Sequence, residues 1–279
     1  MNLNDGTANS PRLEVHQSLT ATIGFTPQWS LEKRFEQIAL AGFFGVHARL
    51  PPLEEWAVWQ RLLEQYNLRF GALLFPALSS DINSLLLEAQ DFGACYANAQ
   101  VQGRFLRLEP SVVLLERILL AQAQSGLPCF VETHRGTVTQ DLLRTLEMLQ
   151  CLPNLNLTLD LSHYVLAGEI GAWVVDAELE AHFAPLLKRS QAIHGRISSS
   201  EQIQVGLDSS MRVHFLNWWK EAMRNWKLNA NNGDILPFVT ELLPPEYAIM
   251  AGGVETTNRW LDALELKVIA EELWRQCHD

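Results

Sequence analysis

The sequence is short of basic residues. Its 21 lysines and arginines stand against 32 aspartates and glutamates, which gives the 279 residues a formal net charge of −11. A protein that binds nucleic acid needs a basic surface to neutralise the phosphates. The charge balance therefore predicts no nucleic-acid partner for the chain as a whole, although it leaves room for a local basic patch.

Cysteines and long apolar runs are also scarce. The four cysteines, at positions 95, 129, 151 and 277, form no CxxC pair, which favours a reduced, cytoplasmic setting over secretion. No segment reaches the roughly 18 to 20 apolar residues of a membrane span, so no membrane association is predicted. The first residues lack the apolar centre of a signal peptide, and we expect residues 1–17 to form a loose tail.

The glycine-rich phosphate-binding motifs are missing as well. No GxGxxG or GxxxxGK[ST] opens a predicted helix, which argues against dinucleotide-binding and P-loop proteins.

What the chain does contain is a repeated strand-then-helix pattern. The predicted strands are residues 18–25, 43–50, 68–75, 95–101, 127–131, 155–161, 191–197 and 235–242. Eight such units predict the α/β class, and specifically a single-domain (β/α)8 TIM barrel over residues 18–279.

Local signals place the helix ends. Ser30 is a predicted N-cap for a helix over residues 31–41, Thr137 or Thr139 for one that runs through Leu149, and Thr256 or Thr257 for the last helix. The helix over residues 213–226 carries three tryptophans, which indicate either core packing or a subunit interface. A homodimer therefore stays open. The long polar stretch over residues 198–210 is predicted to be a loop on the face that carries the site.

Polar side chains follow the later strands at the point where each strand ends. Glu132 closes the strand over residues 127–131, and Asp160, His163, His194 and Glu241 occupy equivalent positions on the next three strands. The carboxyl ends of parallel barrel strands meet around one axis. Carboxylates and an imidazole, without cysteine, suit Mn²⁺, Mg²⁺ or Co²⁺, with Zn²⁺ possible, and crowded carboxylates repel one another unless a cation is present.

Each of these residues also has an ordinary structural explanation. Asp160 could cap a helix, His194 could be a packed core histidine, and Glu241 could be a salt-bridge partner. Their recurrence at equivalent strand ends favours a shared site over three separate explanations.

Four stretches carry a resemblance to a known family: Glu132-Thr133-His134-Arg135-Gly136, Asp160-Leu161-Ser162-His163, Ile193-His194-Gly195-Arg196 and Thr240-Glu241. In this order they resemble the signature stretches of the xylose isomerase-like TIM barrels. This family comprises sugar isomerases and epimerases and includes the endonuclease IV-type apurinic endonucleases. The resemblance implies that Glu132, Asp160, His194 and Glu241 bind one divalent metal ion. It also implies that His163 faces the substrate or completes the metal shell, and that Arg196 holds substrate hydroxyls or a phosphate.

The implied activity is isomerisation or epimerisation of a small sugar or polyol-like carbonyl compound. It proceeds by proton transfer through a metal-stabilised enediolate, with Glu132 and Glu241 as catalytic base and acid. A lyase or dehydratase on the same site and a non-catalytic sugar-binding barrel are the alternatives. The apurinic endonuclease activity is disfavoured, because residues 198–210 supply no histidine. Gly195-Arg196-Ile197 also replaces the lysine-aspartate pair of many sugar isomerases, which leaves the substrate undefined.

Further residues are predicted around the substrate pocket. His134 lies two residues beyond Glu132 and shares its face on an extended strand, so it is predicted to line the pocket, whereas Arg135 is predicted to be a structural ion-pair partner. His47 either lines the pocket or is a packed histidine. Residues 242–247 are expected to form a lid or rim, with Tyr247 as a substrate contact.

Overall fold

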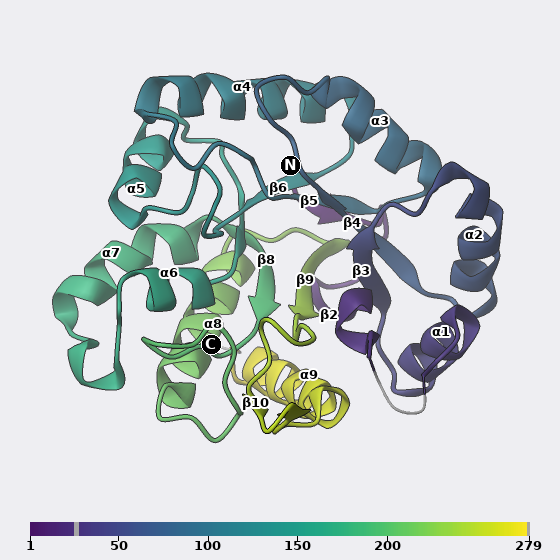
Figure 1. Cartoon of the computed structure of the whole chain (residues 1–279). Helices are drawn as coiled ribbons and strands as arrows, with labels where there is room; N and C mark the ends of the chain where they lie inside the picture. Colours follow the sequence, from purple (N-terminus) through teal and green to yellow (C-terminus); the bar gives the residue numbers. More distant parts are fainter. Residues whose placement is uncertain (25–27, 278–279) are drawn as a thin grey trace.

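The computed structural model describes residues 1–24 and 28–277. It is an eight-stranded parallel barrel surrounded by helices (Figure 1). Its strands follow one another around the barrel in sequence order, and β9 pairs with both β8 and β2, which closes the sheet. The predicted single-domain (β/α)8 barrel is therefore confirmed. The barrel strands are β2 (Arg12–Ser18), β3 (Gly45–Arg49), β4 (Arg69–Leu74), β5 (Tyr96–Ala99), β6 (Cys129–Glu132), β7 (Leu157–Leu159), β8 (Ser190–Gly195) and β9 (Asp234–Thr240).

Helices cover the outside of the barrel and lead from each strand to the next (Figure 1). Two of them, α6 and α7, lie between β7 and β8, and the short α6 was not among the predicted elements. A two-stranded hairpin, β10 (Met250–Ala251) and β11 (Val254–Glu255), precedes the last helix. The helices are α1 (Leu31–Leu40), α2 (Trp56–Gln65), α3 (Ile82–Phe92), α4 (Leu108–Ser125), α5 (Leu142–Cys151), α6 (Ser162–Ala167), α7 (Ala177–Lys188), α8 (Arg212–Lys227) and α9 (Arg259–Gln276).

The first barrel strand lies earlier than predicted. The prediction of a strand over residues 18–25 is wrong. Strand β2 ends at Ser18, and a 3-10 helix follows over Leu19–Thr22; residue 25 lies outside the described residues. In β2 the apolar side chains belong to the core between sheet and helices, whereas Glu14 and His16 contact Arg69 and Tyr96 of other strands. The strand was missed because its inward side chains are polar, the reverse of the usual alternation.

The N-terminal residues are not a loose tail. A short strand, β1 (Leu3–Asn4), pairs antiparallel with the start of β9, where Leu3 lies opposite Ile235. Leu3 is buried and packs with Tyr96 and Phe130 in a small apolar cluster inside the barrel. The prediction of a loose tail over residues 1–17 is therefore wrong, because β1 and most of β2 lie in this segment and both pair with β9.

A glycine makes room for the large aromatic side chain inside the barrel. A Cβ atom at Gly71 of β4 would lie 2.4 Å from the Tyr96 ring, a distance that real contacts do not reach. Tyr96 in turn stacks against Phe130 at 6.0 Å between ring centroids. These side chains fill the barrel axis below the ends of β6 to β9.

Two predicted helix caps are corrected by the structure. Asp141, not Thr137 or Thr139, caps α5, accepting a hydrogen bond from the Arg144 amide at 2.7 Å. At the other end of the chain Asn258 caps α9 in place of the predicted Thr256 or Thr257, accepting from the amides of the first helical turn. Ser30, in contrast, caps α1 as predicted.

The tryptophans of α8 are core residues. Trp218, Trp219 and Trp226 are all buried, and the first and last donate hydrogen bonds to Glu180 and Gln191. The core alternative thus accounts for this stripe without a subunit interface. In the part of the chain that the structure describes, no helix is long and apolar enough to cross a membrane.

Asp262, near the start of α9, makes stability depend on pH. Burial, with Glu265, Glu255 and Asp208 nearby, raises its pKa from 3.8 to about 6. The folded protein then binds more protons than the unfolded chain between these values, so this residue lowers stability as the pH rises through them. We expect Asp262→Asn to raise the melting temperature at pH 8 but not at pH 3.5. Glu272→Gln, the same charge change at an exposed position of α9, is the control; equal shifts for both variants at pH 8 would contradict the assignment.

Candidate metal centre

The four predicted metal ligands meet at the C-terminal end of the barrel. Glu132 ends β6, His194 is the penultimate residue of β8, and Asp160 and Glu241 directly follow the ends of β7 and β9. Their ligand atoms all lie within 4.8 Å of one another, and all four side chains are buried. The structure therefore brings together the set that the sequence singled out, on the barrel face where active sites form.

His194 stands between two of the carboxylates. Its Nδ1 atom is 3.2 Å from Oε2 of Glu241 and 3.7 Å from Oε1 of Glu132. Its Nε2 atom is buried and has no hydrogen-bond partner among the described residues. A buried polar atom without a partner is costly, so the imidazole has unused capacity for a ligand.

Asn98 of β5 and Gln100, which follows that strand, hold Glu132 in place. Asn98 donates a hydrogen bond of 2.5 Å to Oε2, and Gln100 donates to the same oxygen at 3.1 Å. Sequence reasoning missed both residues. The available signal was their spacing of two in a short strand, which puts both on the barrel-facing side with Tyr96.

Threonines fix the backbone at the end of β6. The Thr139 hydroxyl donates to the Glu132 carbonyl at 2.6 Å and accepts from the His134 amide at 3.1 Å. Thr133 links β6 to the next strand, donating to the Asp160 carbonyl at 2.9 Å and accepting from the Asp160 amide at 2.8 Å. These bonds explain why Thr139 does not serve as the helix cap that the sequence suggested.

Asp160 is held from both of its oxygens. Ser162 donates to Oδ1 through its amide at 3.0 Å and through its hydroxyl at 2.5 Å. Arg196 donates to Oδ2 at 2.5 Å. Ser162 was another residue that the sequence did not single out, although it lies inside the quoted Asp160–His163 stretch.

Arg196 lies against the metal-ligand set, which consists of the four candidate ligands Glu132, Asp160, His194 and Glu241. Its guanidinium is fully buried, contacts Glu241 Oε2 at 3.4 Å as well as Asp160, and lies 3.0 Å from His163 Nε2. Arg196 is also among the residues that line the cavity above the site. Its role in substrate binding stays a prediction. The described geometry assigns Arg196 a second task, which is to neutralise one of the buried carboxylates.

The charges of the site do not balance within the protein. Glu132, Asp160 and Glu241 supply three carboxylates against the single guanidinium of Arg196. Burial, together with Glu241 and Asp160, raises the pKa of Glu132 to about 7. Burial alone would lower the pKa of His194, but Glu241 and Glu132 raise it to about 9. Without a metal ion, protons on Glu132 and His194 thus offset the negative charge of the carboxylates. A divalent cation would offset the same charge while both residues are deprotonated. Three carboxylates and one imidazole with an orphaned nitrogen fit a divalent ion.

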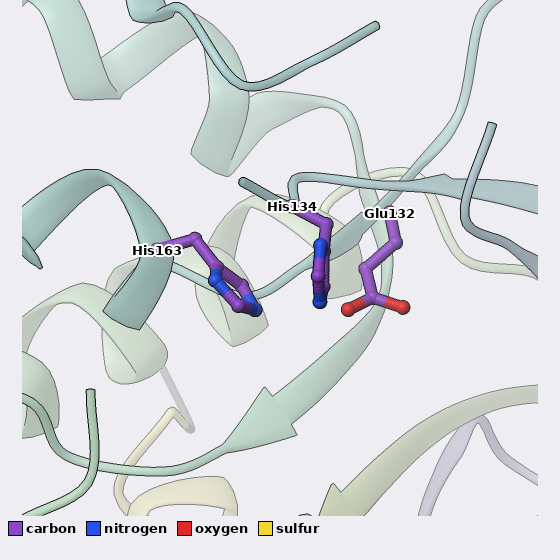
Figure 2. A group of neighbouring side chains, drawn as sticks. All are labelled: Glu132, His134 and His163. Carbon is purple, nitrogen blue, oxygen red and sulfur yellow. The ribbon is translucent and has the colours of Figure 1, made fainter. Parts of the chain in front are cut away.

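A second group of potential ligands adjoins the first and shares Glu132 with it. It consists of Glu132, His134 and His163 (Figure 2). The two imidazole rings lie 3.8 Å apart between centroids, and His134 also contacts the Arg135 carbonyl. Burial lowers the pKa of His134 to about 4 and that of His163 well below its usual value. Both rings are therefore neutral at pH 7, and each has one nitrogen that can accept a hydrogen bond.

A cavity of about 230 Å³ opens above the metal-ligand set. Four of the predicted site residues line it: His47, His134, Arg196 and Glu241. The other four are not among its lining residues and are buried at the ends of β6, β7 and β8: Glu132, Asp160, His163 and His194. Its remaining walls are Ser18, Thr20, Ala48, Arg49, Leu73, Phe75, Gln100, Leu243 and Tyr247.

His47 satisfies both of its predicted roles. It lines the cavity and is also packed, with its ring 5.1 Å from that of His194. Burial lowers its pKa to about 3, so the ring is neutral.

Tyr247 is among the residues that line the cavity, and its predicted contact with the substrate stays a prediction. The guanidinium carbons of Arg196 and Arg135 lie 5.4 Å and 5.2 Å from its ring centroid. Arg135 was predicted to be an ion-pair partner, and this is wrong: among the described residues it has no salt bridge and instead contacts the Tyr247 ring. The segment before Tyr247 is anchored by Gln204 of the β8–α8 loop, which exchanges two hydrogen bonds with the Leu243 backbone at 2.7 and 3.0 Å.

The fold and the buried acidic site define a TIM barrel with a candidate metal centre. Its structural neighbours include a protein described as a xylose isomerase-like TIM barrel, a D-allulose 3-epimerase and an AP endonuclease of family 2, and the chain shares their fold. A D-allulose 3-epimerase from Methylomonas sp. in complex with D-allulose aligns over 98% of this chain and 99% of its own, with 19% identity and a TM-score of 0.61. A xylose isomerase-like TIM barrel protein from Mycobacterium smegmatis in complex with magnesium aligns over 95% and 97%, with 12% identity and a TM-score of 0.59.

A third neighbour has a different activity in its description. The probable 3-DHS dehydratase AsbF from Bacillus anthracis aligns over 92% of this chain and 98% of its own, with 16% identity and a TM-score of 0.54. No family model and no curated protein matches the sequence. At these identities the similarity establishes the fold, and the activity has to be argued from the site.

Proposed function

We propose that the protein is a divalent-metal-dependent isomerase or epimerase of a small sugar or polyol-like carbonyl compound. The observation that carries the proposal is the buried set of three carboxylates and one imidazole within 4.8 Å, at the C-terminal end of a barrel and beneath a cavity. The full-length similarity to a D-allulose 3-epimerase supports the same activity class.

Glu132, Asp160, His194 and Glu241 would hold the metal ion. When bound, a divalent cation acts as a Lewis acid that polarises a substrate carbonyl and stabilises negative charge on its oxygen atoms. The similar magnesium-bound barrel supports a metal of this kind, with Mn²⁺, Mg²⁺ and Co²⁺ favoured and Zn²⁺ compatible with the ligands.

The protein's own carboxylates would move the proton. Isomerisation and epimerisation both remove a proton next to a carbonyl and return one to the substrate. Glu241 lines the cavity, and Glu132, buried at the end of β6 beside it, is held by hydrogen bonds from Asn98 and Gln100. We assign Glu132 and Glu241 as the base and the acid.

The cavity limits the substrate to a small molecule. A volume of about 230 Å³ is below the usual range of roughly 300 to 1,000 Å³ for ligand pockets. Leu73, Phe75 and Leu243 form an apolar wall, while His134 and Gln100 offer hydrogen bonds to hydroxyl groups. This combination suits a compact polyhydroxy carbonyl compound.

Dehydration is a second candidate activity. The similarity to a probable 3-DHS dehydratase favours it, and the first step, removal of a proton next to a carbonyl, is the same. The two activities differ in whether a β-hydroxyl leaves, which a mass change of one water detects.

Metal analysis and solvent-deuterium exchange test the proposal. We expect the purified protein to contain or take up one divalent ion per chain, and the Mn²⁺-loaded protein to incorporate deuterium from D₂O into at least one member of a panel of ketoses. Chelation should remove this exchange, and Mn²⁺ should restore it. A protein that binds no divalent ion, or shows no exchange with any carbonyl compound in the panel, would contradict the proposal.

A further inference from the structure

One wall of the cavity carries an arginine whose charge is not used by the protein. Arg49 is the last residue of β3, and its solvent-exposed side chain lines the cavity. Among the described residues it forms no ion pair and no side-chain hydrogen bond. Its guanidinium carbon lies 4.3 Å from the centroid of the Phe75 ring. Stacking on an aromatic face leaves the N–H groups at the edge of the guanidinium plane free to bind a ligand.

The other charges of the cavity are already matched. Arg196 is paired with Asp160 and Glu241, and Glu241 is the only carboxylate among the lining residues, itself bonded to His194. Arg49 therefore leaves an uncompensated positive charge on the cavity wall, in a protein whose overall charge is −11. An unpaired cation beside a candidate active site favours an anionic ligand group.

The position of Arg49 fits a group at the far end of a bound substrate. In the closed order of strands, β3 is four strands from β7, so Arg49 lies across the barrel from Asp160. A substrate with its carbonyl end at the metal-ligand set would extend toward β3. The planar fork of one guanidinium matches a carboxylate through two parallel hydrogen bonds.

We propose that the substrate is a sugar acid, a polyhydroxy carbonyl compound whose carboxylate is bound by Arg49. This inference rests on the proposed function and adds the substrate class. A single guanidinium and a cavity of about 230 Å³ favour a carboxylate over the larger, doubly charged phosphate group.

Three probes that differ only at carbon 6 test the inference: D-fructose, D-fructuronate and D-fructose 6-phosphate. With the Mn²⁺-loaded full-length protein we expect deuterium exchange with kcat/KM at least about 10-fold higher for fructuronate than for fructose. A charge-assisted hydrogen-bonded pair corresponds to roughly 10- to 150-fold in affinity. Binding of gluconate and of uncharged glucitol, measured by calorimetry, provides the same comparison without turnover, and gluconate should bind more tightly.

Two variants show whether Arg49 is responsible. Arg49→Met should reduce the fructuronate-to-fructose ratio by about 10- to 100-fold, and Arg49→Lys should restore part of it. Arg61→Met, which removes an arginine from the exposed side of α2, should leave the ratio unchanged. A wild-type ratio near one, a preference for the phosphate ester, or a ratio unaffected by Arg49→Met would overturn the inference. Absence of exchange with all three probes together with preferential gluconate binding would instead count against the proposed function alone.

Discussion

Replacing Glu132 by glutamine is expected to lower the rate of deuterium exchange by roughly 10²- to 10⁴-fold, the usual contribution of a general acid or base. Glutamine has the same shape, and its carbonyl oxygen can still accept from Asn98 and Gln100. It cannot accept the substrate proton at neutral pH. The measurement is exchange by NMR with the Mn²⁺-loaded variant.

The same variant should fold normally. It removes one of three crowded, buried carboxylates, so the melting temperature in chelator should equal or exceed that of the wild type. Glu147→Gln, an identical charge change at an exposed position of α5, should change neither quantity. Exchange by Glu132→Gln at the wild-type rate would exclude Glu132 as the proton-transfer group.

Replacing Arg196 by methionine is expected to make stability strongly dependent on metal. Without the guanidinium, Asp160 and Glu241 lose their buried counter-ion, which typically costs about 3 to 5 kcal/mol. For a chain of this size that corresponds to a fall of roughly 6 to 20 °C in melting temperature. A divalent ion in the site supplies the missing charge, so saturating Mn²⁺ should recover much of the loss.

The test is thermal unfolding in chelator and in Mn²⁺. The Mn²⁺-induced rise in melting temperature should be larger for Arg196→Met than for the wild type. Arg212→Met is the matched control, because Arg212 pairs with Glu265 at 2.9 Å on the surface, where a salt bridge contributes about 0 to 1 kcal/mol. If Mn²⁺ stabilised Arg196→Met no more than it stabilised the control, the ion would not replace the charge of Arg196; if it stabilised neither variant, the acidic set would not be a metal centre.

The four residues of the candidate metal centre could be singled out from the sequence because each lies at the end of an apolar strand, in stretches that resemble those of a known family. Barrel geometry then guarantees that ends of successive strands converge. The support around that set was less visible. Asn98 and Gln100 come from β5 and the residue after it, a short stretch with a weak strand signal. Their importance depends on a contact with Glu132 that spans more than 30 residues of sequence.

The errors in the predicted elements have physical causes. Polar side chains of β2 point into the barrel, where Arg69 and Tyr96 meet them, so the strand resembles a solvent-exposed segment. Thr139 has the chemistry of a helix cap but bonds the backbone of β6 instead, and sequence does not show which backbone group is nearest. Arg135 was expected to form an ion pair with an acidic side chain, but its guanidinium lies over the ring of Tyr247, which is more than a hundred residues away in the sequence.

Closure of the barrel by β9 and β2 also dictates when the centre can form. Glu241 directly follows β9, and β9 must pair with a strand from the opposite end of the chain. Contacts so distant in sequence form slowly, because the entropy of closing the loop is lost before they stabilise the chain. During synthesis the ligand set stays incomplete until the last barrel strand has left the ribosome. A divalent ion would therefore bind a chain that has already folded, so it would slow unfolding rather than accelerate folding.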